Sequence, residues 1–340
     1  MDQAVAAKEQ VAAADAAVLD IRGLRTEFRI GGQWHAAVRD LSLALRANET
    51  LAIVGESGSG KSVTALSALR LLPSAGARIA AGAVMFDGRD LTKLSEAEMS
   101  DVRGNAIAMI FQEPMTSLNP TMAIGDQIAE AIVIHRGAAW SSARAQALRL
   151  LDEVKIPAAA TRLDDYPHQF SGGMRQRVMI AMALACRPQV LLADEPTTAL
   201  DVTIQAQVLR QLAELKRAYG MAVLFITHNL GVVAQIADRV AVMYAGEIVE
   251  AASVADLFAR PTHPYTAALL RAMPRVDRDA AGLEPIPGGV PALTAMPTGC
   301  FFAPRCPLRQ ASCTAQHPEL LRFPNGHEVR CPVVLAEAAR

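Results

Sequence analysis

The chain has 340 residues, of which 51% are hydrophobic and 20% are charged, and its formal net charge is −1. This length allows two or three compact units with a sizeable core, and the balanced charge gives no indication of a surface that binds nucleic acid. The longest apolar runs, such as Val178 to Cys186, are far shorter than the ~20 residues that cross a bilayer, so the chain is not expected to span a membrane by itself.

The first residues predict a cytoplasmic protein with an alanine-rich tail. Asp2, Lys8 and Glu9 occur early and no long apolar core follows them, which is unlike a secretory signal. We therefore expect a flexible tail over residues 1–18.

Four segments then predict the beginning of a folded domain. From Val18 to Leu45, short apolar stretches alternate with Gly31-Gly32 and polar residues, which favours an antiparallel edge sheet. Leu51 to Val54 is a continuous apolar run that suits a buried parallel strand, and Val63 to Leu72 has helix-forming composition. Val84 to Arg89 indicates a further strand and turn.

The segment GESGSGKS lies between the predicted buried strand and helix. Its glycines allow successive backbone N–H groups to converge on phosphate oxygens, and the helix offers its positive N-terminal end. The lysine reaches the β and γ phosphates, and the hydroxyl that follows it binds Mg²⁺. The segment therefore predicts a P-loop for a nucleoside triphosphate. Its expected nucleotide-binding residues are Gly55, Glu56, Ser57, Gly58, Ser59, Gly60, Lys61, Ser62 and Thr64.

Residues 120 to 185 predict a mostly helical insert, interrupted by Gly137 and Pro157. After the insert, the alternation of strands and helices resumes. The expected helices are Ile124 to Ile134, Ser141 to Val154, Met174 to Cys186 and Thr203 to Tyr219, and the expected strands are Val190 to Ala193, Ala222 to Thr227 and Val240 to Tyr244.

Two carboxylates follow the apolar strand at Val190 to Ala193. In an open parallel sheet, ligands gather at the carboxyl ends of strands. We therefore expect Asp194 to hold Mg²⁺ through water and Glu195 to polarise the attacking water.

Past Arg260 the chain becomes rich in proline and carries clustered cysteines, which indicates an appended module. Closely spaced cysteines in a chain expected in the cytosol favour a metal over disulfides. Zinc is the usual metal for four thiolates, but its sites usually contain tighter cysteine pairs, and loose spacing also suits a [4Fe–4S] cluster. A third interpretation is that the thiols bind no metal and simply pack in the core. We expect this for Cys186, which lies in a predicted apolar helix. The four candidate ligands are Cys300, Cys306, Cys313 and Cys331.

Several motifs occur in the order in which they occur in ATP-binding-cassette (ABC) ATPases. After the P-loop, the segment at 110–114 resembles the Q-loop of that family, and Ser171-Gly172-Gly173 resembles its signature. Thr198 to Asp201 is similar to the D-loop, and Ile226-Thr227-His228 is similar to the switch-histidine segment. In the signature, Phe170 and Met174 replace the Leu and Gln of the commonest form, and the Met form resembles the peptide-importer branch.

This resemblance covers about residues 19 to 275 and implies an α/β fold of the P-loop NTPase class. It would be an ABC cassette at 19–260, with a RecA-like core, an antiparallel β edge sheet and a helical subdomain at about 115–185. Residues 261–340 would form a small Cys-rich extension of the oligopeptide-transporter type.

The resemblance also implies roles in ATP hydrolysis. Gln112 would coordinate Mg²⁺, as would Ser62 and Asp194, and would report the nucleotide state to the helical subdomain. Glu195 and His228 would position the attacking water.

Other roles implied by the family concern a second subunit and the adenine base. Ser171, Gly172 and Gly173, at a helix N-terminus, would cap the γ-phosphate of ATP bound to another subunit. Asp201 would couple the two sites, and Phe28 falls where the family places an aromatic ring against adenine.

Two longer stretches, QEPMTSLNP at 112–120 and YPHQFSGGMRQR at 166–177, resemble ATPases of dipeptide, oligopeptide, nickel and glutathione importers, as does His263 to Thr266. They imply a peripheral subunit at the cytoplasmic face of the inner membrane that hydrolyses ATP to import peptides or related small solutes. Its partners would be transmembrane permease subunits, a second identical or different ATP-binding subunit and, indirectly, an extracytoplasmic solute-binding protein. Similar C-terminal cysteines in that family imply the [4Fe–4S] cluster.

Two other classes share the nucleotide sandwich. A DNA-repair or chromosome-organising ATPase needs long heptad arms or a basic DNA-facing surface, and this chain has neither. A translation-factor relative carries two cassettes per chain, and only one P-loop occurs here.

Overall fold

The computed structural model describes residues 17–113, 117–198, 200–273 and 285–334. The chain divides into two compact units, which are described separately. Unit 1 contains the described parts of residues 1–19, 45–49 and 93–225, and unit 2 contains residues 20–44, 50–92 and the described parts of 226–340. The predicted cassette at 19–260 is therefore represented in both units, and the described part of the predicted extension lies in unit 2.

The first sheet of unit 2 begins with a hairpin. Strands β1 (Ala17–Ile30) and β2 (Gln33–Arg46) are neighbours joined by Gly31 and Gly32, whose φ angles of 56° and 84° suit a tight hairpin turn. The full sheet order is β2-β1-β4-β5, with β4 (Ala77–Phe86) antiparallel to β5 (Arg89–Asp90). This hairpin agrees with the predicted edge sheet. The predicted tail lies outside the described residues up to residue 16, and residues 17 and 18 already belong to β1.

The second sheet of unit 2 carries the P-loop. Strand β3 (Thr50–Val54) is fully buried and pairs in parallel with β9 (Arg239–Tyr244), which is antiparallel to β10 (Glu247–Ser253). The order continues through two short strands of the extension, β12 (Glu328–Val329) and β11 (Leu321–Arg322). The extension therefore adds strands to the edge of the same sheet.

Short helices accompany this sheet. Helix α2 (Lys61–Ala68) follows the P-loop and ends earlier than the predicted helix, because Arg70 has a φ of 53°. The other helical segments of unit 2 are α10 (Leu230–Ile236), α11 (Val254–Ala259), α12 (Pro264–Arg271), α13 (Ala311–Ala315), η1 (Leu91–Lys93) and η4 (Ala303–Arg305).

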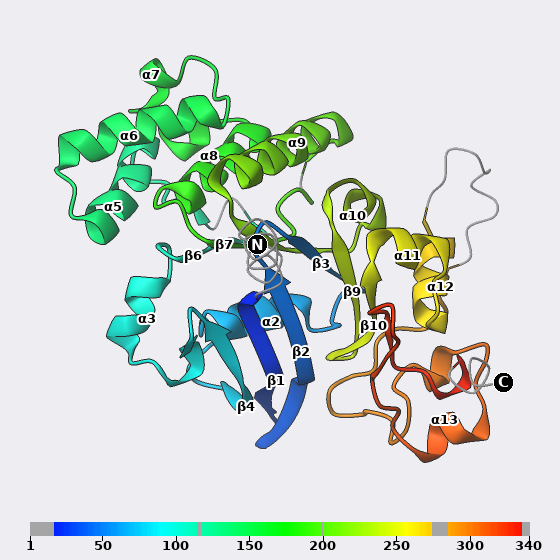
Figure 1. Ribbon diagram of the computed structural model, residues 1–340. Coiled ribbons are helices and arrows are strands. Elements are labelled where there is room, and N and C mark those ends of the chain that lie inside the picture. The colour runs from blue at the N-terminus through cyan, green and yellow to red at the C-terminus, as the bar shows by residue number, and fades with distance from the viewer. Residues whose placement is uncertain (1–16, 114–116, 199, 274–284, 335–340) are drawn as a thin grey trace, which may run out of the picture. The chain divides into compact units, whose positions relative to one another are not determined.

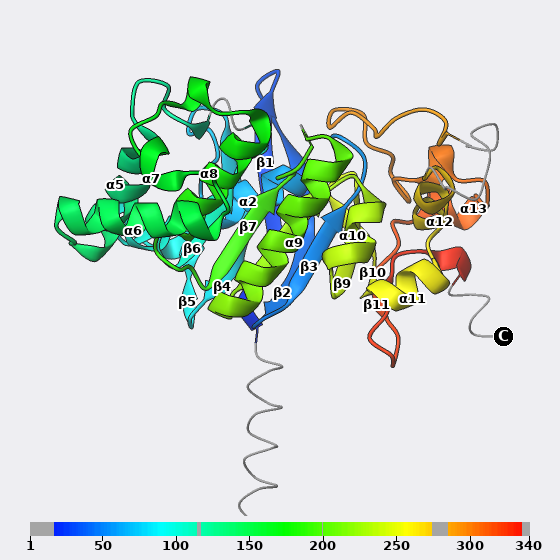
Figure 2. The same ribbon diagram turned by 90° about the horizontal axis from the view of Figure 1, so that it is seen from above.

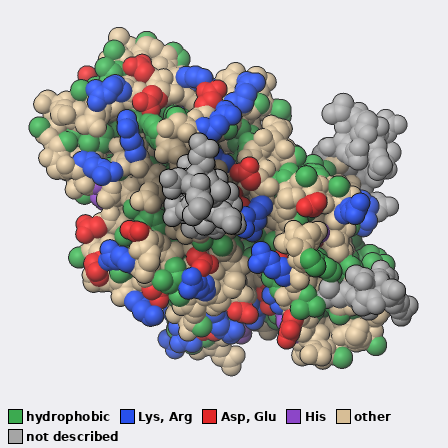
Figure 3. All heavy atoms as spheres, viewed as in Figure 1, with side chains coloured by type: hydrophobic (Ala, Val, Ile, Leu, Met, Phe, Trp, Pro, Cys, Tyr) green, Lys and Arg blue, Asp and Glu red, His purple; other side chains and the backbone are tan. Residues whose placement is uncertain are grey.

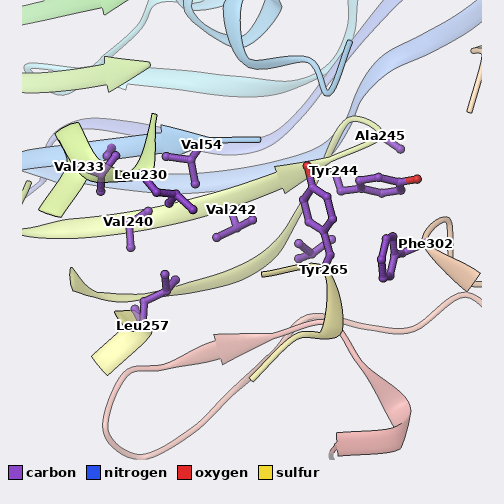
Figure 4. Packing of buried hydrophobic residues seen from close by; sticks show 13 residues of the cluster. Val54, Leu230, Val233, Val240, Val242, Tyr244, Ala245, Leu257, Tyr265 and Phe302 are labelled. Carbon is purple, nitrogen blue, oxygen red and sulfur yellow. The ribbon is translucent and has the colours of Figure 1, made fainter. Parts of the chain in front are cut away.

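One apolar core joins β3, β9, α10, α11, α12 and the extension (Figure 4). It includes three aromatic rings: the Tyr244 and Tyr265 ring centroids are 4.7 Å apart, and Phe302 lies 5.3 Å from each. In the same unit, Glu250 of β10 is fully buried and accepts hydrogen bonds from the backbone N–H groups of Thr262 and His263 and from His327. The extension is therefore fixed to the sheet by both apolar packing and a satisfied buried carboxylate.

Unit 1 contains strands β6 (Ile107–Ile110), β7 (Val190–Asp194) and β8 (Ala222–Thr227), whose last residues begin unit 2. They are neighbours in the order β8-β7-β6, and β6 and β7 are parallel. Both β7 and β8 are continuously buried, which explains their unbroken apolar sequences.

The predicted helical insert is helical in the structure, where α5, α6 and α8 pack together (Figures 1 and 2). The helical segments of unit 1 are α3 (Glu96–Val102), α5 (Ile124–Arg136), α6 (Trp140–Glu153), α7 (Ala159–Arg162), η2 (Pro167–Gln169), α8 (Gly172–Leu184) and α9 (Val202–Tyr219).

Within the described ranges, no helix has both the length and the apolar composition needed to cross a bilayer. On the face shown in Figure 3, Lys and Arg side chains are interspersed with Asp and Glu, in agreement with the balanced net charge.

Candidate functional site

The P-loop is shaped by glycines that no other residue could replace without strain. Gly60 precedes α2 with a φ of 102°, and a Cβ atom there would lie 2.7 Å from the carbonyl oxygen of Ala37 and 2.8 Å from Met243 Cε. A Cβ on Gly55 would lie 2.2 Å from the carbonyl oxygen of Met243. Strands β2 and β9 therefore press on the loop closely enough to exclude side chains at both positions.

Lys61 is almost fully buried, with 6% of its surface exposed. Its Nζ donates to the carbonyl oxygens of Gly55 at 2.8 Å and Glu56 at 3.0 Å, so the ammonium lies against the loop that precedes it. The loop is also held by the turn after β9, because the N–H of Gly246 donates to the carbonyl of Ser59 at 2.9 Å. Ser59 is itself completely buried. The position of this cation and the start of α2 together give a compact positive site suited to phosphate.

In unit 1, strand register places two predicted catalytic side chains side by side. Ile110 of β6 pairs with Ala193 of β7, so Gln112 and Glu195 follow their strands at equivalent positions. Gln112 Nε2 donates to Glu195 Oε2 at 3.3 Å. The parallel sheet therefore brings the amide and the carboxylate to one edge, as expected for ligands of a strand-end site.

The conformation of Glu195 is unusual for a residue with a side chain. Its φ is 46°, in the left-handed region, and Oε2 also accepts from the Thr198 hydroxyl at 2.9 Å. Strained backbone of this kind clusters at functional sites. Asp194, the last residue of β7, is 4% exposed. The contact with Thr198 was not predicted, although a hydroxyl three residues after a strand-end carboxylate is a local signal that could have indicated it.

The signature segment begins a helix. Ser171 is the N-cap of α8, and its hydroxyl accepts from the N–H of Met174 at 3.4 Å. A Cβ on Gly173 would lie 2.7 Å from Ile204 Cγ2, so α8 and α9 meet closely here. An open pocket of about 420 Å³ adjoins this helix N-terminus. It is lined by Lys155, Pro157, Ser171, Gly172, Gly173, Met174, Arg177, Leu200, Asp201 and Ile204.

Asp201 of the predicted D-loop lines the same pocket and caps α9. Its Oδ1 accepts from the N–H of Ile204 at 3.0 Å. Ala199 in this motif, and residues 114–116 beyond the predicted Q-loop glutamine, lie outside the described residues.

Two further predicted residues belong to unit 2. His228 directly follows β8 and is exposed, beside Asn229, which caps α10. Phe28 lies near the end of β1 and is partly exposed. The P-loop, His228 and Phe28 thus lie in unit 2, whereas Gln112, Asp194, Glu195, Asp201 and the signature lie in unit 1. The roles expected of all these residues stay predictions.

The four C-terminal cysteines lie within electrostatic reach of one another, but they do not form a metal-ligand set. Burial raises the pKa of Cys300 to about 11, and the thiols of Cys313 and Cys331 add to this increase. Burial likewise raises the pKa values of Cys306 and Cys331, which disfavours the thiolates that a metal requires. Within the part of the chain that the structure describes, no group of three or more His, Cys, Asp or Glu residues is arranged to hold a metal ion. The geometry therefore does not support the predicted [4Fe–4S] or zinc site.

Comparison with protein families identifies two regions. Residues 38–198 match the family described as ABC transporter, and residues 249–313 match the family described as oligopeptide/dipeptide transporter, C-terminal region.

Relatives cover most of the chain. A probable peptide ABC transporter ATP-binding protein of Sinorhizobium fredii is 54% identical over 315 residues, which are 92% of this chain and 94% of the relative. The dipeptide transport ATP-binding protein DppD of Bacillus subtilis is 50% identical over 314 residues, with the same shares of 92% and 94%. These names give no support to the alternative of a DNA-repair or chromosome-organising ATPase.

Solved structures agree on the fold. The ATP-binding cassette MJ0796 in a post-hydrolysis state bound to ADP and Pi is 26% identical, with a TM-score of 0.63, and the match covers 69% of this chain and 98% of that one. A second dimeric structure of MJ0796, described as a bacterial ABC transporter cassette, is 27% identical with a TM-score of 0.62 and the same coverage. The chain therefore belongs to the ATP-binding subunits of ABC transporters that carry the oligopeptide/dipeptide transporter C-terminal region, and it is an ATPase of that family.

Proposed function

We propose that this ATPase powers the import of peptides or related small solutes through a membrane permease. The proposal is supported by relatives that are named for peptide and dipeptide transport and match over nine-tenths of the chain, and by the matching C-terminal family. The chain would act as a peripheral subunit at the cytoplasmic face of the inner membrane. Its direct partners would be permease subunits and a second ATP-binding subunit, and it would serve a solute-binding protein only indirectly.

In the proposed reaction, the P-loop binds the triphosphate. Backbone N–H groups from Gly55 to Ser62 and the start of α2 surround the phosphates, with Thr64 supporting the first turn through its hydroxyl bond to the Gly60 carbonyl at 3.0 Å. The buried Lys61 ammonium neutralises the β and γ phosphates. Phe28 would lie against the adenine ring.

Mg²⁺ fits the donor chemistry of Ser62, Gln112 and Asp194, since hydroxyl, amide and carboxylate oxygens are the ligands it prefers. When bound, it neutralises charge on the β and γ phosphates and orients them for in-line attack. Glu195 would accept a proton from the attacking water, and His228 would help to hold that water. The observation that carries this assignment is the contact between Gln112 and Glu195 at adjacent strand ends. This contact would link Gln112, the proposed sensor of the nucleotide, to Glu195, the proposed base.

A second subunit would complete the site. A single P-loop contacts one side of a triphosphate, and the N-terminus of α8 can offer Ser171, Gly172 and Gly173 to the γ-phosphate of another copy. The open pocket beside these residues supports this use, because it lies at the helix N-terminus and Lys155 and Arg177 are among the residues that line it. Asp201, in the same pocket, would transmit the state of one site to the other. Hydrolysis removes the γ-phosphate contacts, and the dimer would then open.

We also propose the iron–sulfur cluster on narrower grounds. Its support is the resemblance of the four C-terminal cysteines to those of peptide-importer ATPases, together with their loose sequence spacing, which is less typical of zinc. As they lie in the structure, the four thiols are not arranged as a set of ligands. Such a cluster would supply positive charge that stabilises the thiolates of Cys300, Cys306, Cys313 and Cys331. No step of ATP hydrolysis depends on it.

Glu195 is the proposed base. Glu195→Gln keeps the size and the hydrogen-bonding ability of the side chain but cannot accept the proton, so ATP turnover should fall by ~100-fold or more. MgATP binding should persist, and a closed dimer should accumulate in size-exclusion chromatography. Glu130→Gln, which changes an exposed residue of α5, is the matched control. Normal turnover by Glu195→Gln would remove the assignment of the base.

The proposed permease partner should determine where the chain is found in the cell. The chain should sediment with membranes when it is expressed together with its permease, and it should remain in the supernatant when the permease is missing. Proteins that copurify from solubilised membranes should include permease subunits and a solute-binding protein. Stimulation of ATP hydrolysis by DNA or ribosomes, with no response to permease, would contradict the import function.

The metal content of the purified protein tests the proposed role of the four C-terminal cysteines. Protein purified without oxygen should contain iron and acid-labile sulfide, and replacing Cys313 by Ser should remove both. Stoichiometric zinc without iron would replace the cluster with a zinc site. Absence of both metals would show that the thiols are simply packed.

A further inference from the structure

An ion pair connects the C-terminal extension to the P-loop. Arg305 Nη1 lies 2.6 Å from Glu56 Oε2, and Nη2 lies 3.0 Å from Glu56 Oε1. The Arg305 side chain is 6% exposed and the Glu56 side chain 28% exposed, so the pair is largely shielded from water. A bidentate pair of this kind fixes direction as well as charge. It joins the second residue of GESGSGKS to a residue 249 positions later in the chain.

The guanidinium is held in place on its other sides. Arg305 Nε donates to the carbonyl of Pro287 at 2.8 Å, and Nη2 donates to the carbonyl of Ile286 at 3.3 Å. Its central carbon lies 5.8 Å from the centroid of the Tyr244 ring and 5.9 Å from that of Phe302. The extension therefore presents the positive group in a fixed position, which reduces the entropy lost in holding Glu56.

The backbone of Glu56 has a second partner from outside the loop. Its N–H donates to the Tyr265 hydroxyl at 2.9 Å. Tyr265 is the second residue of α12, is completely buried and packs against Tyr244 and Phe302 (Figure 4). The carbonyl of Glu56 accepts from Lys61 Nζ. Side chain, N–H and carbonyl of this single residue are therefore all fixed.

Glu56 places a negative charge in a loop built to bind a polyanion. A carboxylate within several ångströms of the phosphates would oppose ATP binding, most strongly where water is excluded. The bidentate contact with Arg305 offsets that charge locally. Because Glu56 O also orients Lys61, movement of Glu56 would in turn displace the ammonium that meets the phosphates.

We propose that Arg305 is a positioning residue for the P-loop: it neutralises and orients Glu56, and thereby sets the affinity of the subunit for ATP. Tyr265 supports the same residue through its backbone. The C-terminal extension then contributes directly to nucleotide binding, through a contact within unit 2. This inference rests on the proposed use of the P-loop to bind MgATP.

The test measures MgATP affinity of the full purified chain by isothermal titration calorimetry. Arg305→Met keeps the apolar stem and removes the charge, and it should raise the Kd about tenfold, the size expected for one uncompensated charge near the phosphates. Turnover at saturating ATP should change much less than KM. Arg309→Met, at an exposed position of the same segment, is the matched control and should bind like the unchanged protein. If the unchanged protein fails to bind MgATP, the proposed function itself is wrong, and the inference falls with it.

A double-mutant cycle separates positioning from folding. If Arg305 acts through the carboxylate, Arg305→Met should have less than about a twofold effect in the Glu56→Gln background. Arg305→Lys keeps the charge but loses the bidentate geometry, and it should raise the Kd about threefold, which supplies a test if the Met variant does not fold. A lower melting temperature with unchanged Kd, or the same tenfold effect in both backgrounds, would overturn the proposal.

Discussion

The conformation of the loop between β3 and α2 determines where a phosphate chain can bind, and the neighbouring strands and the extension are arranged around it. A triphosphate is strongly anionic, and it can be held only where several N–H groups and an ammonium converge without competing negative charge. Gly55 and Gly60 allow that convergence because they have no side chain. At both positions a Cβ atom would collide with a neighbouring strand, β9 at Gly55 and both β2 and β9 at Gly60. The turn after β9 adds a backbone hydrogen bond to Ser59. The shape of the phosphate site is therefore determined by neighbouring strands as much as by the loop itself.

The same constraint explains why Glu56 needs so many partners. Its carboxylate is the one charge in the loop with the wrong sign for phosphate, and it pairs with an arginine from the extension. Arg305 directly precedes Cys306, so the packing of the clustered cysteines and the geometry of this ion pair are linked through one peptide. The extension is in turn fixed to the sheet by the buried Glu250, by β12 and by the aromatic rings around Tyr265. The C-terminal extension, which the sequence indicates as an appended module, is therefore part of the sheet that carries the P-loop.

Features determined by local sequence were predictable. The buried strands β3, β7 and β8, the helices of the insert and the P-loop have apolar runs, helical spacing or glycine patterns that act over a few residues. Their order, compared with the ABC family, also identified the ATPase.

Features that depend on pairing between residues far apart in the sequence were missed or misjudged. Nothing near residue 305 indicates that its partner is Glu56, and nothing in β10 alone indicates that it pairs with a strand of the extension. The four cysteines suggested a metal by their number, whereas their ligand geometry depends on how separate loops pack, and the structure does not show it.

Lys61 and the glycine-shaped loop are proposed to form the phosphate site for one ATP per chain. Calorimetric titration of the purified protein with MgATP, beside Lys61→Ala, tests it most directly. We expect a single saturable site in the unchanged protein and binding weakened by at least about tenfold when the ammonium is removed. Heat changes that show no binding with excess Mg²⁺, or equal affinity in the two proteins, would contradict it.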